Sequence, residues 1–182
     1  MRTVTTAHFA VDVQGNAPTV QFRSAEGQLT REGSAKGTAK LDEGRQILEL
    51  LFVIIGQTLY LHPPTGPVER LPASVLSSYF DPRSILDPDR GLASVLASGQ
   101  GATTEGREQV EGVDSYRVTV TFPPQPLGTL APGLRLTPDK PSEIWVATQG
   151  SRLLKAQVPT AYGTATVQLS DFDAPAEITP PA

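Results

Sequence analysis

The side chains that could do chemistry are few and scattered in this sequence. There are two histidines, His8 and His62, and no cysteine, which excludes thiol nucleophiles, disulfides and sulfur-ligated metal sites. The nearest carboxylates, Asp81, Asp87 and Asp89, occupy turn and helix-start positions, where aspartate caps backbone N–H groups. No phosphate-binding glycine loop and no G-x-S-x-G nucleophile motif occurs. We therefore expect no enzyme activity, no catalytic or metal site and no cofactor.

The composition describes one turn-rich domain of mild charge. Of 182 residues, 38% are hydrophobic, 16 are glycine and 17 are proline, and the formal net charge is -4. A negative balance argues against non-specific binding of nucleic acid, which needs cationic side chains to neutralise phosphates. No apolar stretch approaches the roughly 20 residues of a membrane-spanning helix. We expect a single domain over residues 1–172 and a disordered tail over residues 173–182.

Alternation of apolar and polar residues is the main pattern and predicts antiparallel strands. It is clean over residues 116–122 and recurs over 6–13, 35–41 and 164–170. Further strands are expected over residues 20–23, 47–55, 57–61, 67–71, 106–110, 143–148 and 153–158, which gives about nine to eleven in total.

Two features refine this prediction. Gly112 and Gly150 mark hairpin turns, because glycine supplies the positive φ that such turns need. Residues 47–55 are apolar on both sides except for Glu49, so we expect a strand covered on both faces, with Leu50 and its alternate neighbours pointing inward.

Helix signals gather between residues 72 and 98. Pro72 suits a first helical turn, after which Val75, Leu76, Tyr79 and Phe80 form one apolar stripe. The sequence Asp87-Pro88-Asp89 predicts the start of a second helix, which Leu92, Val95 and Leu96 continue and Ser98-Gly99 ends. One irregular turn is expected over residues 127–130. Together the elements predict an α+β fold, a strongly curved antiparallel β half-barrel with short helices on its concave face.

The concave face is either a solid core or the lining of a cavity. Several inward residues are small, among them Ala35, Gly37 and Ala39, and short helices would leave space above a sheet of many strands. An apolar cavity of this kind binds hydrocarbon. Its expected lining comes from the strands and the helices: Phe9, Val11, Val13, Val20, Phe22, Leu50, Phe52, Ile54, Val75, Leu76, Tyr79, Leu92, Val95, Leu96, Tyr116, Val118, Val120 and Phe122.

A polar mouth would have to read the headgroup, because apolar walls discriminate weakly between similar chains. Arg83 and Arg90 lie beside the helical segment and are the candidates. The alternative is that both are structural surface arginines.

Three segments, taken in order and spacing, resemble one protein family. They are Tyr79-Phe80-Asp81-Pro82 with residues 85–92, residues 105–118, and Pro141 to Ala147 around Trp145. This arrangement is similar to the LppX/LprG-type (LppX_LprAFG) lipoproteins of mycobacteria and related actinobacteria, and the similarity extends from about residue 6 to residue 171.

The resemblance implies a half-barrel that is also similar to the periplasmic lipoprotein carriers (LolA/LolB-like). Members hold acylated lipids or glycolipids between sheet and helices and move them across the cell envelope, sometimes alongside a membrane exporter. They carry a signal peptide and an acylated N-terminal cysteine, whereas this sequence has no cysteine. Either the sequence begins just after the anchor, or this member is unanchored.

We therefore expect a non-enzymatic carrier of an acylated lipid or glycolipid. It would work at the outer face of the cell membrane and be lipid-anchored in the full-length protein. The alternative is an envelope scaffold with a filled core that is the partner of a membrane exporter. A lipid-acting hydrolase is a third hypothesis, for which the sequence offers no catalytic group.

Overall fold

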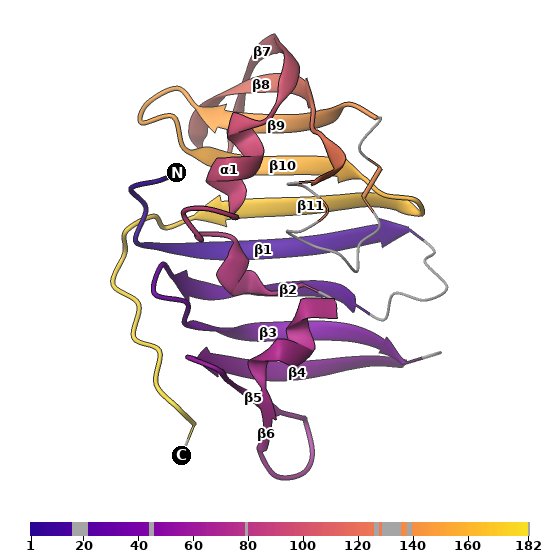
Figure 1. The fold of residues 1–182 in the computed structure, drawn as a ribbon, viewed down its shortest axis with the longest axis vertical. Helices are drawn as coiled ribbons and strands as arrows, with labels where there is room; N and C mark the ends of the chain where they lie inside the picture. The colour runs from indigo at the N-terminus through magenta and orange to yellow at the C-terminus, as the bar shows by residue number, and fades with distance from the viewer. Residues whose placement is uncertain are drawn as a thin grey trace.

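One antiparallel sheet is the framework of the protein (Figure 1). The computed structural model describes residues 1–15, 22–43, 46–78, 80–125, 128, 136–137 and 140–181. The eleven strands are β1 (Thr6–Gly15), β2 (Phe22–Thr30), β3 (Ala35–Glu43), β4 (Gln46–Ile55), β5 (Thr58–His62), β6 (Glu69–Pro72), β7 (Gln100–Val110), β8 (Val113–Thr121), β9 (Ser142–Ala147), β10 (Leu153–Pro159) and β11 (Gly163–Ser170).

The strand order is β6-β5-β4-β3-β2-β1-β11-β10-β9-β8-β7. The chain thus runs as one meander from β1 to β6 and as a second from β7 to β11, and β11 pairs with β1 to join them. This confirms the predicted open antiparallel sheet. The hairpin turn predicted at Gly112 is also confirmed, since Glu111 and Gly112 between β7 and β8 have φ of 50° and 81°.

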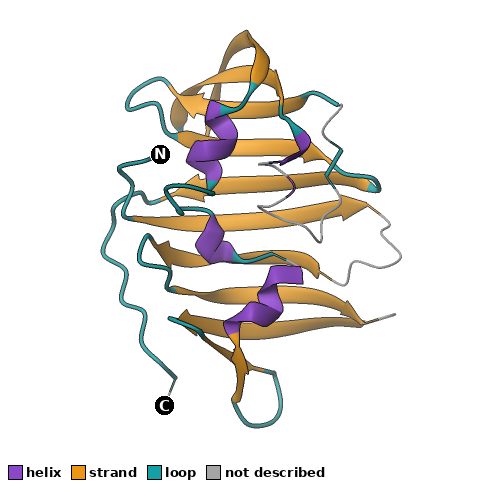
Figure 2. Ribbon diagram, viewed as in Figure 1, coloured by secondary structure: helices purple, strands orange, loops and turns teal. Residues whose placement is uncertain are grey.

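The helical segment between β6 and β7 crosses one face of the sheet, the inner face (Figure 2). It contains two 3-10 helices, η1 (Ala73–Ser78) and η2 (Pro82–Ser84), and the α-helix α1 (Leu92–Ala97). Inner-face residues are buried as the alternation predicts: Phe9 and Ile54 are both 0% exposed. At the α1 end, Gly99 lies so close to β8 that an added Cβ would be 2.7 Å from Val120 Cγ2.

The helix boundaries differ from the prediction. Pro72 is the last residue of β6, and the turn that follows it is a 3-10 helix. The α-helix begins at Leu92 with Gly91 as its N-cap, not after Asp87. Asp87 instead closes a turn, because its Oδ1 accepts hydrogen bonds of 2.9 Å from the backbone N–H groups of both Asp89 and Arg90. An aspartate that closes a turn and one that caps a helix look alike in sequence.

The prediction that the strand over residues 47–55 is covered on both faces is wrong. The inner residues of β4 are buried, but Ile47 and Leu51 on its outer face are 55% and 54% exposed. The physical reason is that η1, η2 and α1 all lie on the inner face (Figure 1). Strand β2, which spans Phe22–Thr30, is longer than the strand predicted over residues 20–23. The irregular turn predicted over residues 127–130 lies outside the described residues, apart from Gly128.

Residues 173–181, for which we expected disorder, run past the strand ends beside the start of β1 (Figure 1). Asp173 joins the two ends of the chain. Its N–H donates to the Thr6 carbonyl at 2.9 Å, and its Oδ1 accepts from the Thr5 N–H at 2.8 Å. Its Oδ2 accepts from Arg152 at 2.6 Å.

This attachment should weaken in acid. The backbone hydrogen bond from Thr5 is the largest cause that lowers the pKa of Asp173 below the ordinary 3.8. A lowered pKa means that the carboxylate stabilises the attached tail fully above the ordinary value, and that this contribution is lost as the pH falls through the lowered one. The protection factor of the Asp173 amide, which is the exchange rate corrected for its intrinsic pH dependence, should therefore fall below about pH 4.

The same region offers a matched pair of variants. Asp173→Ala should lower the hydrogen-exchange protection of the amide at position 173, which donates to Thr6, at neutral pH. Glu177→Ala should not, because Glu177 accepts from Lys36 through its backbone carbonyl. Equal protection of the tail in both variants would contradict the attachment by Asp173.

Candidate functional site

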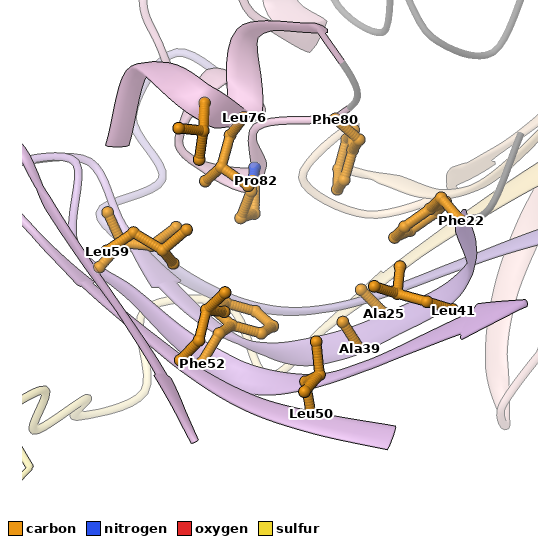
Figure 3. A pocket seen from close by; sticks show the side chains of 13 residues that line it. Phe22, Ala25, Ala39, Leu41, Leu50, Phe52, Leu59, Leu76, Phe80 and Pro82 are labelled. Atoms are coloured by element: carbon orange, nitrogen blue, oxygen red, sulfur yellow. The ribbon is translucent and has the colours of Figure 1, made fainter. Parts of the chain in front are cut away.

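An apolar cavity lies between the inner face of β2–β5 and the segment that carries η1 and η2 (Figure 3). Its volume is about 230 Å³. Thirteen residues line it: Phe22, Ala25, Ala39, Leu41, Leu50, Phe52, Ile54, Leu59, Leu61, Val75, Leu76, Phe80 and Pro82. All of these side chains are apolar, so the cavity offers hydrocarbon contacts and no charge. We call it the inner cavity.

Small residues at the floor of the inner cavity create its space. Ala25 and Ala39 are register partners on β2 and β3, and both line the cavity. Next to them, Gly27 pairs with Gly37. A Cβ on Gly27 would lie 2.0 Å from the Lys36 carbonyl oxygen, and one on Gly37 would lie 1.9 Å from that of Glu26. Only glycine fits where β2 and β3 lie so close together. The small residues of these two strands therefore allow the close approach of the backbones and leave the space above the floor.

The side wall comes from β4 and β5. Leu50, Phe52 and Ile54 alternate with outward residues and therefore share the inner face of β4. Phe52 pairs with Leu61, and Ile54 pairs with Leu59. Ile54 and Leu59 are almost completely buried, so the cavity is closed at this end.

The roof is formed by Val75, Leu76, Phe80 and Pro82, and the chain on either side of these residues is attached to the sheet by polar contacts. Arg83 pairs with Asp81 through Nε and a terminal nitrogen at 2.9 and 2.6 Å, and its other terminal nitrogen donates to the Gly56 carbonyl at 2.7 Å. Side-chain hydrogen bonding to Asp81 raises the pKa of Arg83 above its ordinary value, so Arg83 stays charged. The Ala73 N–H also donates to the Gln57 carbonyl at 2.8 Å. The β4–β5 turn thus holds the roof.

Arg83→Met should therefore loosen the roof. Losing charge-assisted hydrogen bonds from a partly buried guanidinium, on a side chain that is 18% exposed, should lower the free energy of unfolding by about 1–3 kcal/mol, measured by urea denaturation. Arg90→Met is the matched control. Arg90 is 82% exposed and pairs with Asp87 at 3.3 Å, so its loss should cost under about 0.5 kcal/mol. Equal effects of the two variants would contradict the roof attachment.

The two arginines proposed for the mouth thus have different surroundings. The guanidinium of Arg83 is occupied by Asp81 and Gly56, and that of Arg90 lies at the surface beside Asp87. Neither residue lines the inner cavity. The most exposed of the lining residues is Val75 on η1, which is 40% exposed. The rim of the cavity at the roof is therefore apolar.

Some of the predicted lining residues meet at the inner cavity and others do not. Six line it: Phe22, Leu50, Phe52, Ile54, Val75 and Leu76. Six are buried in the hydrophobic core elsewhere: Phe9, Val11, Leu92, Val95, Val120 and Phe122. Three are partly buried against that core: Val13, Leu96 and Val118. Tyr116 instead lies under Arg107, which donates to its hydroxyl at 2.7 Å. Val20 and Tyr79 lie outside the described residues.

Seven lining residues were not in the predicted set: Ala25, Ala39, Leu41, Leu59, Leu61, Phe80 and Pro82. A signal existed for three of them. Ala39 and Leu41 shared the apolar side of the alternation over residues 35–41, and Phe80 belonged to the apolar stripe of the helical segment. The choice of large side chains as lining missed the small residues that make the space.

The described residues offer the inner cavity no chemistry beyond binding. Within the described ranges, no three histidine, aspartate or glutamate side chains lie together as metal ligands would. None of the helices in the described part of the chain has the length and hydrophobicity that crossing a bilayer requires. An engineered core cavity of about 150 Å³ with similar walls binds benzene, so the larger inner cavity suits a longer hydrocarbon.

Comparisons with known proteins agree with this geometry. The model of the LppX_LprAFG lipoprotein family matches residues 1–178. The lipoarabinomannan carrier protein LprG of Mycobacteroides abscessus is 35% identical over 190 residues, covering 100% of this chain and 79% of the relative. LprG of Mycolicibacterium smegmatis is 32% identical, covering 100% and 78%. The crystal structure of LprF from Mycobacterium bovis superposes with a TM-score of 0.84 at 25% identity, covering 100% of this chain and 91% of that one.

Proposed function

Because this chain belongs to the LppX_LprAFG lipoprotein family, we propose that it is a carrier that holds an acyl chain of a lipid or glycolipid in the inner cavity. The family consists of envelope lipoproteins and is not enzymatic, as the sequence led us to expect. The observation that carries the proposal is the lining: thirteen apolar side chains line a space of about 230 Å³ beside the buried core.

The energetics suit a carrier. Each buried methylene contributes about 0.8 kcal/mol, so ten methylenes contribute about 8 kcal/mol before costs. Ordering of the chain and loss of its free movement offset part of this gain. The result is binding that holds a lipid in water yet allows its release at a membrane.

Transport across the envelope is the finer part of the proposal. The roof is short, contains Pro82 and does not belong to the sheet; hydrogen bonds of Arg83 and Ala73 attach it to the β4–β5 turn. We propose that it opens to admit the lipid while the sheet stays intact. Relatives with the printed name lipoarabinomannan carrier support a glycolipid as cargo. We also propose, from the family resemblance, that an N-terminal lipid anchor holds the protein at the membrane and that a membrane exporter is its partner.

Organic extraction of the purified protein followed by mass spectrometry tests the proposal. The carrier hypothesis predicts co-purified acyl lipid, at about one molecule per cavity, and transfer of that lipid to acceptor vesicles. The alternative, an envelope scaffold that acts through its surface, predicts no bound lipid. Protein that contains no lipid and that takes up no fatty acid after delipidation would overturn the proposal.

A further inference from the structure

Three phenylalanine rings meet at one end of the inner cavity. They come from β1, from β2 and from the roof: Phe9, Phe22 and Phe80. The Phe80 ring centroid lies 5.9 Å from that of Phe22 and 6.4 Å from that of Phe9, and both pairs are tilted, as aromatic rings prefer. We call these residues the phenylalanine wall.

The wall stands at the border between the cavity and the packed core. Phe22 and Phe80 line the cavity, whereas Phe9 does not and is fully buried. In the sheet, Ala25 at the cavity floor pairs with Val11 of β1, which belongs to the core. In Figure 3, Phe80 and Phe22 lie at one end of the cavity, and Leu59 lies at the other.

We propose that Phe80 sets the length of acyl chain that the inner cavity accepts. This inference rests on the proposed function. A chain that enters the cavity and extends along its floor meets the Phe80 ring before it reaches Val11. Each methylene that cannot be buried forfeits about fourfold in affinity. Phe80 is the member of the wall that lies outside the sheet, between η1 and η2.

The test is a chain-length series of saturated fatty acids, from about ten to twenty carbons, bound to delipidated protein. For the wild type, affinity should rise with length and then stop rising. Phe80→Ala removes the ring and opens the cavity toward Val11, so the length at which affinity stops rising should increase by about two to four carbons.

Phe122→Ala is the matched control. Phe122 is a buried core phenylalanine that does not line the inner cavity, so its removal should leave the preferred length unchanged. Phe80→Leu and Phe80→Trp guard against a misfolded alanine variant: leucine should give a smaller increase, and tryptophan should shorten the preferred length.

The outcomes separate the two claims. If the wild type binds no fatty acid of any length, the proposed function fails. If it binds them but every Phe80 variant keeps the wild-type preference, the length-setting role of Phe80 is overturned. A shift of the same size in Phe122→Ala would also overturn that role, because it would show a general loosening of the core.

Discussion

Replacing Ala39 by phenylalanine should abolish lipid loading and leave the protein folded. Ala39 lies at the centre of the cavity floor, between Ala25 of β2 and Leu50 of β4 in register. A phenyl ring at this position would project into the cavity and occupy the space of the acyl chain. We expect at least about a tenfold fall in lipid per protein, with a change in unfolding free energy within the roughly 1–3 kcal/mol of overpacking.

Thr38→Phe is the matched control for this variant. Thr38 is the preceding residue of β3 and points to the outer face, where it pairs with Leu51. The same ring on the opposite face should leave lipid loading at the wild-type level. Mass spectrometry of extracted lipid, with circular dichroism to check the fold, measures both. Full loading of Ala39→Phe, or equal loss in both variants, would contradict the cavity.

Truncating Phe9 and truncating Phe52 to alanine should lower the free energy of unfolding by different amounts. The Phe9 ring packs in the core, whereas the Phe52 ring lines the cavity. Phe9 is fully buried in the core, so Phe9→Ala should lower the free energy of unfolding by about 3–5 kcal/mol. Phe52 is also buried, but part of its ring lines the cavity. A surface next to a void has fewer partner atoms, so Phe52→Ala should cost about 1–2 kcal/mol less than Phe9→Ala.

Urea denaturation of delipidated protein measures this difference. A saturating fatty acid should stabilise the wild type by about 2.7 kcal/mol at a hundredfold excess over Kd. It should stabilise Phe52→Ala less, because part of the cavity wall is missing. Equal costs of the two truncations without lipid would mean that the space beside Phe52 is as well packed as the core.

Period-two alternation predicted the sheet because each strand has one buried and one solvated face. Thus Phe9 and Val11 are buried where the pattern placed them. The same logic failed for Ile47 and Leu51, since an apolar residue on an outer strand face looks like a buried one in sequence. The prediction that a helix begins after Asp87 was wrong for a related reason. Asp87 accepts local backbone hydrogen bonds, and an aspartate does so both in a turn and at the start of a helix.

The site was only half predictable. Alternation identifies inward strand residues such as Phe52, and the helical stripe identifies Leu92, but neither pattern reveals which part of the inner face is left uncovered. The position of the helices decides that: Leu92 and Val95 are buried in the core, whereas η1 and η2 stand over Ala25 and Ala39. Contacts between segments that are far apart in the sequence set this arrangement. The hydrogen bond from the Arg83 guanidinium to the Gly56 carbonyl is an example.

Photo-crosslinking with a fatty acid that carries a diazirine near its methyl end tests most directly whether the inner cavity holds the acyl chain. The adducts are mapped by peptide mass spectrometry. We expect them on the lining residues at the end where the chain meets the phenylalanine wall, Phe22, Ala25 and Phe80, and we expect unlabelled fatty acid to suppress them. Adducts confined to outer-face residues such as Ile47 and Leu51, or insensitive to competitor, would contradict the account.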